Sequence, residues 1–204
     1  ARDVDCLSHA PFLADELFGR YAEPEELRLS AAPKARLYLP RCISAFVGAD
    51  ITSALVASQI CARPESALLA DIGTNGELAL WHKGRLLCCS TAAGPAFEGA
   101  KISCGMRGAE GAVDHVFLKN GEVSYHVIGD KPPVGLCGSG LLDLVAVLLE
   151  TGTIDETGRL EAGTYRLCDQ VSLTQKDVRE AQLAKAAIRA GITLMARKIG
   201  IAIG

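Results

Sequence analysis

An acid and a glycine-rich turn separate two apolar stretches in LLADIGTNGELAL, residues 68–80. The pattern predicts two strands that pair as a hairpin, and a two-residue turn at Asn75-Gly76 is enough to reverse the chain. Such a turn explains neither Asp71, at the tip of the first strand, nor the Gly73-Thr74 pair that follows it. We therefore expect this segment to do more than connect two strands.

Two further glycine-rich segments follow, AGPAFEG at residues 93–99 and GLCGSG at residues 135–140. Glycine lets the backbone approach an anion closely, and successive amides form an anion-binding nest. A helix that opens at Gly138 would add the positive end of its dipole. Neither the G-x-x-x-x-G-K-[ST] loop nor the G-x-G-x-x-G loop is present. Taken singly, each segment therefore favours a tight turn over a phosphate site.

Three polar residues in these segments have two interpretations each. Asp71 could hold Mg²⁺ through water, since Mg²⁺ takes few protein ligands. It could equally well be the first residue of an Asx turn. Glu98 could orient a water or a metal ion, although an acid that ties the loop to backbone amides is favoured. Ser139 fits a phosphate ligand and also a helix N-cap, and the two roles are compatible.

The chain has 204 residues, of which 49% are hydrophobic, and a formal net charge of −3. This length accommodates one domain or two small ones with a proper core. No apolar run reaches the ~18 residues of a membrane span, and interspersed charges with few aromatic residues argue against nucleic-acid binding. Helical and strand patterns together indicate an α/β fold. The predicted strands cover 67–71, 77–81, 86–90, 112–118 and 123–128, and the predicted helices cover 51–61, 97–103, 138–150 and 175–198.

The last of these helices begins with Thr174 and Asp177, which approximate a capping box. Gln182 and Lys185 lie about one turn apart on it and could reach a nucleotide, although a solvated face is the favoured interpretation. The histidines at positions 82, 115 and 126 have no matching ligand partners in the sequence, so we assign them no chemistry.

Eight cysteines occur without a C-x-x-C pair and without the Cys/His spacing of a zinc site. We expect most of them to be buried small hydrophobic residues in a reducing cytoplasm. Cys137 precedes a helix N-terminus, where a reactive thiol is one interpretation and a buried structural thiol the favoured one. Cys88 and Cys89 should point to opposite faces of a strand, one of them into the core.

Four segments together resemble the reductive activators of corrinoid proteins, which are ferredoxin-fused members of the sugar kinase, heat-shock cognate and actin (ASKHA) superfamily. The segments are LPRCISAFVGADI, ADIGTNGELAL, AAGPAFEGAKISCGMRG and VGLCGSGLLDLVA. The resemblance covers nearly the whole chain and implies an RNase H-like, actin-type ATPase fold with a mixed sheet flanked by helices. It also implies ATP-driven delivery of one electron that returns an inactive Co(II) corrinoid protein to Co(I).

The resemblance further implies a set of site residues and cofactors. Asp71 would be the catalytic acid and would hold Mg²⁺, through water. ATP and Mg²⁺ would be the cofactors, and a 2Fe-2S cluster is expected only in an N-terminal domain of the parent protein, since no cysteine cluster here could hold it. The residues that would contact the ATP phosphates are Gly73, Thr74, Asn75, Gly76, Gly94, Glu98, Gly138, Ser139 and Gly140.

The expected partner is a corrinoid protein of a methyltransferase system, and the parent is expected to be a homodimer that binds neither nucleic acid nor membrane. The sequence departs from the family pattern because an earlier Asp-Ile-Gly-Thr-Thr phosphate loop and a later adenosine-contacting segment are both absent. We therefore expect a chain cut at both ends. Residues 1–66 would be the end of the first ASKHA lobe with a connecting helix, and residues 67–204 would be the second lobe, truncated at its C-terminus.

The intact parent is expected to be an ATP-dependent reductive activase, and the isolated chain to be inactive. Two alternatives stay open at this point. One is a related activator of radical dehydratases or a small-molecule kinase of the same superfamily. The other is a non-catalytic module that docks a corrinoid protein and dimerises.

Overall fold

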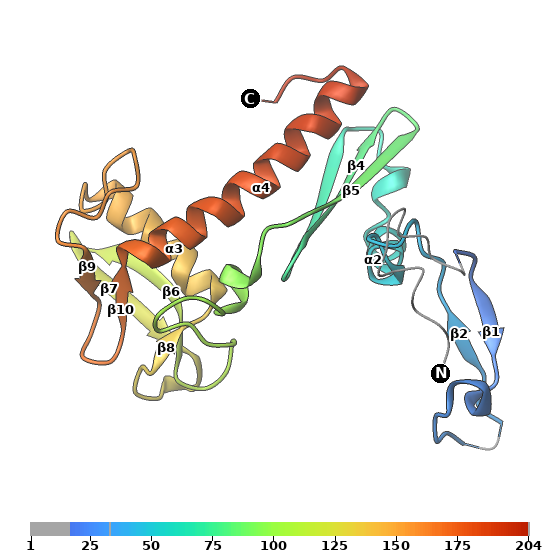
Figure 1. Cartoon of the computed structure of the whole chain (residues 1–204), viewed down its shortest axis with the longest axis horizontal. Helices are drawn as coiled ribbons and strands as arrows, with labels where there is room; N and C mark the ends of the chain where they lie inside the picture. Colours follow the sequence, from blue (N-terminus) through green and yellow to red (C-terminus); the bar gives the residue numbers. More distant parts are fainter. Residues whose placement is uncertain (1–16, 33, 204) are drawn as a thin grey trace. The chain divides into compact units, whose positions relative to one another are not determined.

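The structure, a computed structural model, describes residues 17–32 and 34–203, which form two compact units (Figure 1). The first unit takes its described residues from the segments 1–71, 77–90 and 192–204. The second unit consists of 72–76 and 91–191. Within the described part of the chain, no helix has the length and apolar content needed to cross a membrane.

The first unit holds two small sheets and a helix. β1 and β2 pair antiparallel, and β3, β4 and β5 form a second sheet in that order. Helix α2 packs Ile51 and Leu55 against Ala79 of β4 to form the core of this unit. The elements are β1 (Arg20–Ala22), η1 (Pro24–Leu27), β2 (Leu37–Leu39), α2 (Ala49–Ser58), η2 (Ile60–Ala62), β3 (Ala67–Ile72), β4 (Gly76–His82) and β5 (Arg85–Thr91). The sequence predicted β3 to β5 and α2, but not β1 and β2.

The second unit is built on a mixed sheet in which β6 is central, antiparallel to β7 and parallel to β8. β9 and β10 form a separate antiparallel pair. Helix α4 continues past residue 191 into the segment assigned to the first unit. The elements are η3 (Pro95–Glu98), β6 (Ala112–Lys119), β7 (Glu122–Val127), η4 (Ile128–Asp130), β8 (Gly135–Leu136), α3 (Gly138–Glu150), β9 (Thr164–Arg166), β10 (Ser172–Thr174) and α4 (Gln175–Ile199).

Helix α3 covers one face of β6 and forms the main core with it. Its Leu141, Leu144 and Leu148 recur at helical spacing and are at most 1% exposed. Burial of each leucine stabilises the fold by about 1.5–3 kcal/mol before entropy is subtracted. The apolar face predicted for this helix is therefore confirmed, with Val145 half-buried at its margin.

The turns differ in how well the sequence predicted them. Asn120-Gly121, between β6 and β7, has φ angles of 54° and 84°, as a type I′ hairpin turn requires. Neither residue of Asn75-Gly76 has a positive φ, so the two-residue turn predicted there is wrong. Instead a three-residue loop joins β3 to β4, and the Gly73 amide donates to the Asn75 carbonyl at 2.9 Å. The helix predicted at 97–103 is replaced by the shorter η3.

Asp177 is a fully buried carboxylate in the first turn of α4. Its Oδ2 accepts the Thr174 amide at 2.8 Å, and the Thr174 hydroxyl accepts the Asp177 amide at 3.3 Å, which confirms the capping box. Its Oδ1 accepts the amide and the hydroxyl of Ser103 at 2.8 and 3.1 Å. One side chain therefore caps α4 and fastens the loop that follows η3.

Replacing Asp177 by alanine should destabilise the protein by at least about 3 kcal/mol, because the buried carboxylate accepts four hydrogen bonds from Thr174 and Ser103 and all four are lost. The free energy of unfolding, measured by urea denaturation, checks this. Asp169→Ala, at an exposed position, is the control and should change it by less than about 0.5 kcal/mol. Equal stabilities of the two variants would contradict the role given to Asp177.

Candidate functional site

The three glycine-rich segments come together in the second unit. The Thr74 hydroxyl, in the loop between β3 and β4, donates a hydrogen bond to the Glu98 carboxylate of η3. The next contact is between backbones, because a Cβ on Gly138 would lie 1.9 Å from the Phe97 carbonyl oxygen. Only glycine permits that approach. The β3–β4 loop and the start of α3 therefore both contact η3, which joins them.

Helix α3 presents its N-terminus to this junction. Its first helical hydrogen bond runs from the Leu141 amide to the Cys137 carbonyl at 2.9 Å. The amides of residues 138–140 therefore have no carbonyl partner within the helix. Cys137 is the N-cap and makes no side-chain cap, so the interpretation of Ser139 as N-cap is wrong. Ser139 is exposed, whereas Gly140 is buried against β6.

Gly76, the first residue of β4, is buried in a tight contact. A Cβ on Gly76 would lie 2.6 Å from the Thr91 hydroxyl oxygen and 3.2 Å from Cγ1 of Ile188 on α4. The Thr91 hydroxyl also donates to the Gly76 carbonyl at 3.0 Å. Packing, rather than a left-handed backbone, therefore requires glycine here.

Gly76→Ala should destabilise the protein by about 1–3 kcal/mol, since the added methyl group overpacks the contact with Thr91. Thr91→Ala removes the oxygen that the methyl group meets. The double variant should therefore be less unstable than the sum of the two single variants, as measured by urea denaturation. Additive effects would show that Thr91 is not the obstacle.

The remaining predicted site residues occupy the surface around these contacts. Asp71 is exposed on β3, one residue before the loop segment of the second unit, and Asn75 is exposed in that loop. Gly94 caps η3 with φ of 76°. The donors around these contacts are backbone amides and the hydroxyls of Thr74 and Ser139, of which the Thr74 hydroxyl donates to Glu98. The described residues contain no group of three or more His, Cys, Asp or Glu side chains able to hold a metal ion by themselves.

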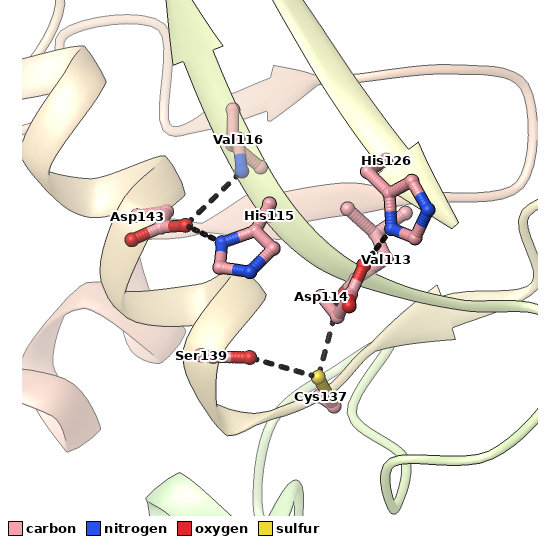
Figure 2. A network of polar contacts seen from close by, with 8 residues as sticks. All are labelled: Val113, Asp114, His115, Val116, His126, Cys137, Ser139 and Asp143. Atoms are coloured by element: carbon pink, nitrogen blue, oxygen red, sulfur yellow. Dashed lines mark hydrogen bonds and ion pairs between the residues drawn. The ribbon is translucent and has the colours of Figure 1, made fainter. Parts of the chain in front are cut away.

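Behind the start of α3 lies a polar network that the sequence did not predict (Figure 2). The Cys137 thiol donates to the Val113 carbonyl at 3.4 Å and lies 3.3 Å from the Ser139 hydroxyl. Cys137 is buried, which confirms the structural interpretation of this thiol. Asp143 of α3 accepts the Val116 amide at 3.3 Å and contacts His115 Nδ1 at 3.0 Å. β8 pairs only with Ala112 and Val113 of β6. Asp143 accepts a hydrogen bond from the same strand beyond that point, where β8 does not cover its edge.

The second histidine of this network forms an ion pair. His126 Nδ1 lies 2.6 Å from Asp114 Oδ1, and the hydrogen bond to Asp114 raises the pKa of His126. The same hydrogen bond lowers the pKa of Asp114. We assigned the histidines no chemistry from the sequence. The one sequence signal for the pair is the predicted hairpin, which brings residues near 114 opposite residues near 126.

The His126–Asp114 pair should stabilise the fold where His126 is protonated and Asp114 ionised. That contribution is lost as pH rises through the raised pKa of His126, and lost as pH falls through the lowered pKa of Asp114. Asp114→Asn should therefore reduce thermal stability at about pH 5 and have less effect at about pH 9. NMR titration of His126 should show a lower pKa in the variant. An unchanged His126 titration would contradict the pairing, and His82, which bonds Ser66, is the internal reference.

A cavity of about 160 Å³ lies between α3 and α4 within the second unit. It begins at Leu142, one turn after Gly138, and Lys185 lies on the α4 side. The Gln182 amide is held by the Thr157 carbonyl at 3.1 Å and by Arg179 at 2.6 Å, so it serves the packing of the loop before β9. Of the two residues considered for nucleotide contact, Lys185 is the exposed one.

The described cysteines are less buried than the sequence predicted. Cys137 alone among them is fully buried, Cys61 is exposed, and the others are half-buried. Cys88 packs against the core of the first unit, whereas Cys89, on the other face of β5, does not belong to it. Burial raises the pKa of both thiols, which keeps them protonated near neutral pH.

Comparisons with known proteins agree on one family. The family model described as the C-terminal domain of RACo, the ASKHA domain, matches residues 65–204. The chain is 36% identical over 197 residues to the corrinoid activation enzyme RamQ of Eubacterium limosum, covering 83% of this chain and 33% of that protein. It is 30% identical over 213 residues to the [Co(II) methylated amine-specific corrinoid protein] reductase of Methanosarcina barkeri, covering 93% and 38%.

A solved structure of a reductive activator for a corrinoid, iron-sulfur protein matches with a TM-score of 0.84 and 32% identity. The match covers 97% of this chain and 35% of that chain. This likeness confirms the predicted ASKHA fold with its mixed sheet and helices. The chain thus spans between 33% and 38% of the length of the relatives it matches.

Proposed function

The chain belongs to the family of the C-terminal ASKHA domain of RACo, and from that membership we propose that it is the phosphate-binding part of a reductive activator of a corrinoid protein. In this proposal ATP binding drives the one-electron reduction of an inactive Co(II) corrinoid protein to Co(I). The names of the relatives, a corrinoid activation enzyme and a Co(II) corrinoid protein reductase, support the substrate class. The proposed partner is accordingly a corrinoid protein.

The observation that carries the proposal is the meeting of the three glycine-rich segments in one unit. The Thr74–Glu98 hydrogen bond and the approach of Gly138 to Phe97 place two glycine loops beside the start of a helix. Early helical amides and the helix dipole favour a phosphate at such a position. We propose that the loop 73–76 and the amides of 138–140 bind the ATP phosphates, with Thr74 and Ser139 as hydroxyl donors.

The carboxylates near these loops, those of Asp71 and Glu98, offer the hard oxygen ligands that Mg²⁺ prefers. Mg²⁺ is held in nucleotide sites by one or two carboxylates together with phosphate oxygens and water, so a preformed group of three ligands is not needed. When bound, the ion would neutralise phosphate charge. Asp71 directly precedes the phosphate-binding loop in the sequence, and we propose that it holds the ion through water.

The electron carrier of this proposal lies outside the described residues. Their cysteines do not gather into a group that could hold an iron–sulfur cluster. We therefore propose that a 2Fe-2S domain of the intact protein supplies the electron and that the nucleotide unit controls its delivery. A cytoplasmic homodimer is the proposed form of the intact protein.

Mg-ATP should bind the 204-residue chain weakly, with a dissociation constant of about 1 mM, because the chain has one Asp-Ile-Gly-Thr phosphate loop where the family pattern has two. In an NMR titration the shifted amides should lie in 72–76, in η3 and in the first turn of α3. Hydrolysis should be negligible. Asp71→Asn should weaken binding by about tenfold while leaving the fold intact, since Asp71 is exposed.

Glu65→Gln is the matched control, because it also removes one exposed negative charge just before β3. It should bind Mg-ATP as the unmodified chain does. The proposal fails if saturating Mg-ATP shifts none of the amides in the three loops, or if Asp71→Asn leaves the dissociation constant of Mg-ATP unchanged.

A further inference from the structure

The hydrogen bond from Thr74 to Glu98 is made by two exposed side chains. A threonine hydroxyl has one proton to donate. While Thr74 donates it to Glu98, the same proton is not available to a phosphate oxygen. The contact between these two side chains therefore competes with the ligand proposed for the loop.

Charge makes the competition stronger. Among the described residues, no ion pair joins Glu98 to a lysine or arginine within 4.0 Å. Glu98 Oε1 lies 3.7 Å from the position of a Cβ on Gly73, close to the backbone of the loop that would hold the phosphates. A metal-free polyphosphate there meets a like charge at short range, whereas a divalent cation between them turns the repulsion into attraction.

A neutral side chain could also accept this hydrogen bond, although a weaker one. The Thr74 hydroxyl would donate to the carbonyl oxygen of a glutamine in the same geometry. Closing the loop therefore requires an acceptor at position 98 but not a charge, and the charge needs a different explanation.

We infer that Glu98 makes the phosphate loop selective for the metal complex of a nucleoside triphosphate over the metal-free form. In the structure its carboxylate accepts the Thr74 hydroxyl. When a polyphosphate enters, Thr74 turns its proton to a phosphate oxygen and Glu98 turns to the cation or to a water bound to it. This role rests on the proposed function, because it needs phosphate at this loop.

The test measures the dissociation constant of ATP for the 204-residue chain by NMR titration, once with excess MgCl2 and once with EDTA. The quantity compared is a ratio: the dissociation constant of ATP in EDTA divided by the dissociation constant of ATP in excess MgCl2. Glu98→Gln keeps the acceptor for Thr74 and removes the charge. Its ratio should be at least about tenfold smaller than that of the unmodified chain, chiefly because metal-free ATP binds more tightly.

Glu161→Gln removes an exposed negative charge from the loop before β9 and should leave the ratio unchanged. If Glu98→Gln has the ratio of the unmodified chain, the inference is overturned while the proposed phosphate site stands. If the unmodified chain binds ATP under neither condition, the phosphate site and the inference fail together.

Discussion

The buried carboxylate of Asp177 fixes the geometry on which the candidate site depends. A charge without solvent is tolerated only when hydrogen bonds satisfy it, and Thr174 and Ser103 supply them from two different segments. The segment 97–103 is held at its end by the hydrogen bonds of Ser103 to Asp177 and at its start by the contact of Phe97 with Gly138. Both ends of the segment that contains Glu98 are therefore set by contacts that have little freedom to move.

The most closely packed parts of the site are contacts between backbones. Gly138 lies against the Phe97 carbonyl, and Gly105 lies against the Gly99 carbonyl, where an added Cβ would be 1.9 Å from the oxygen in each case. Segments that approach this closely leave amide groups, rather than long side chains, as the groups facing a ligand. A site of this kind leaves its trace in the sequence as spaced glycines with few charged residues, which is the pattern of AGPAFEG and GLCGSG.

The sequence predicted those parts of the molecule that local patterns determine. Strands β3 to β7, the apolar face of α3 and the capping box at Asp177 all follow from periodicity or from residues three positions apart. The loop at 73–75 was predicted incorrectly, because an Asn-Gly pair favours a tight turn unless tertiary contacts impose another conformation. The Asp143 contact to β6 was missed since it joins residues 27 positions apart that no local pattern relates. The roles of the site residues came from resemblance and not from spacing.

Rigid and adjustable contacts are divided between backbone and side chains in this site. The amides at the start of α3 are held by helix packing, with Gly140 buried against β6, so they are in place before any ligand arrives. The Thr74 and Glu98 side chains are exposed, and exposed side chains change rotamer within picoseconds to nanoseconds. Under the proposed function, a phosphate that enters this loop displaces the Thr74–Glu98 hydrogen bond, while the amides at the start of α3 keep their positions.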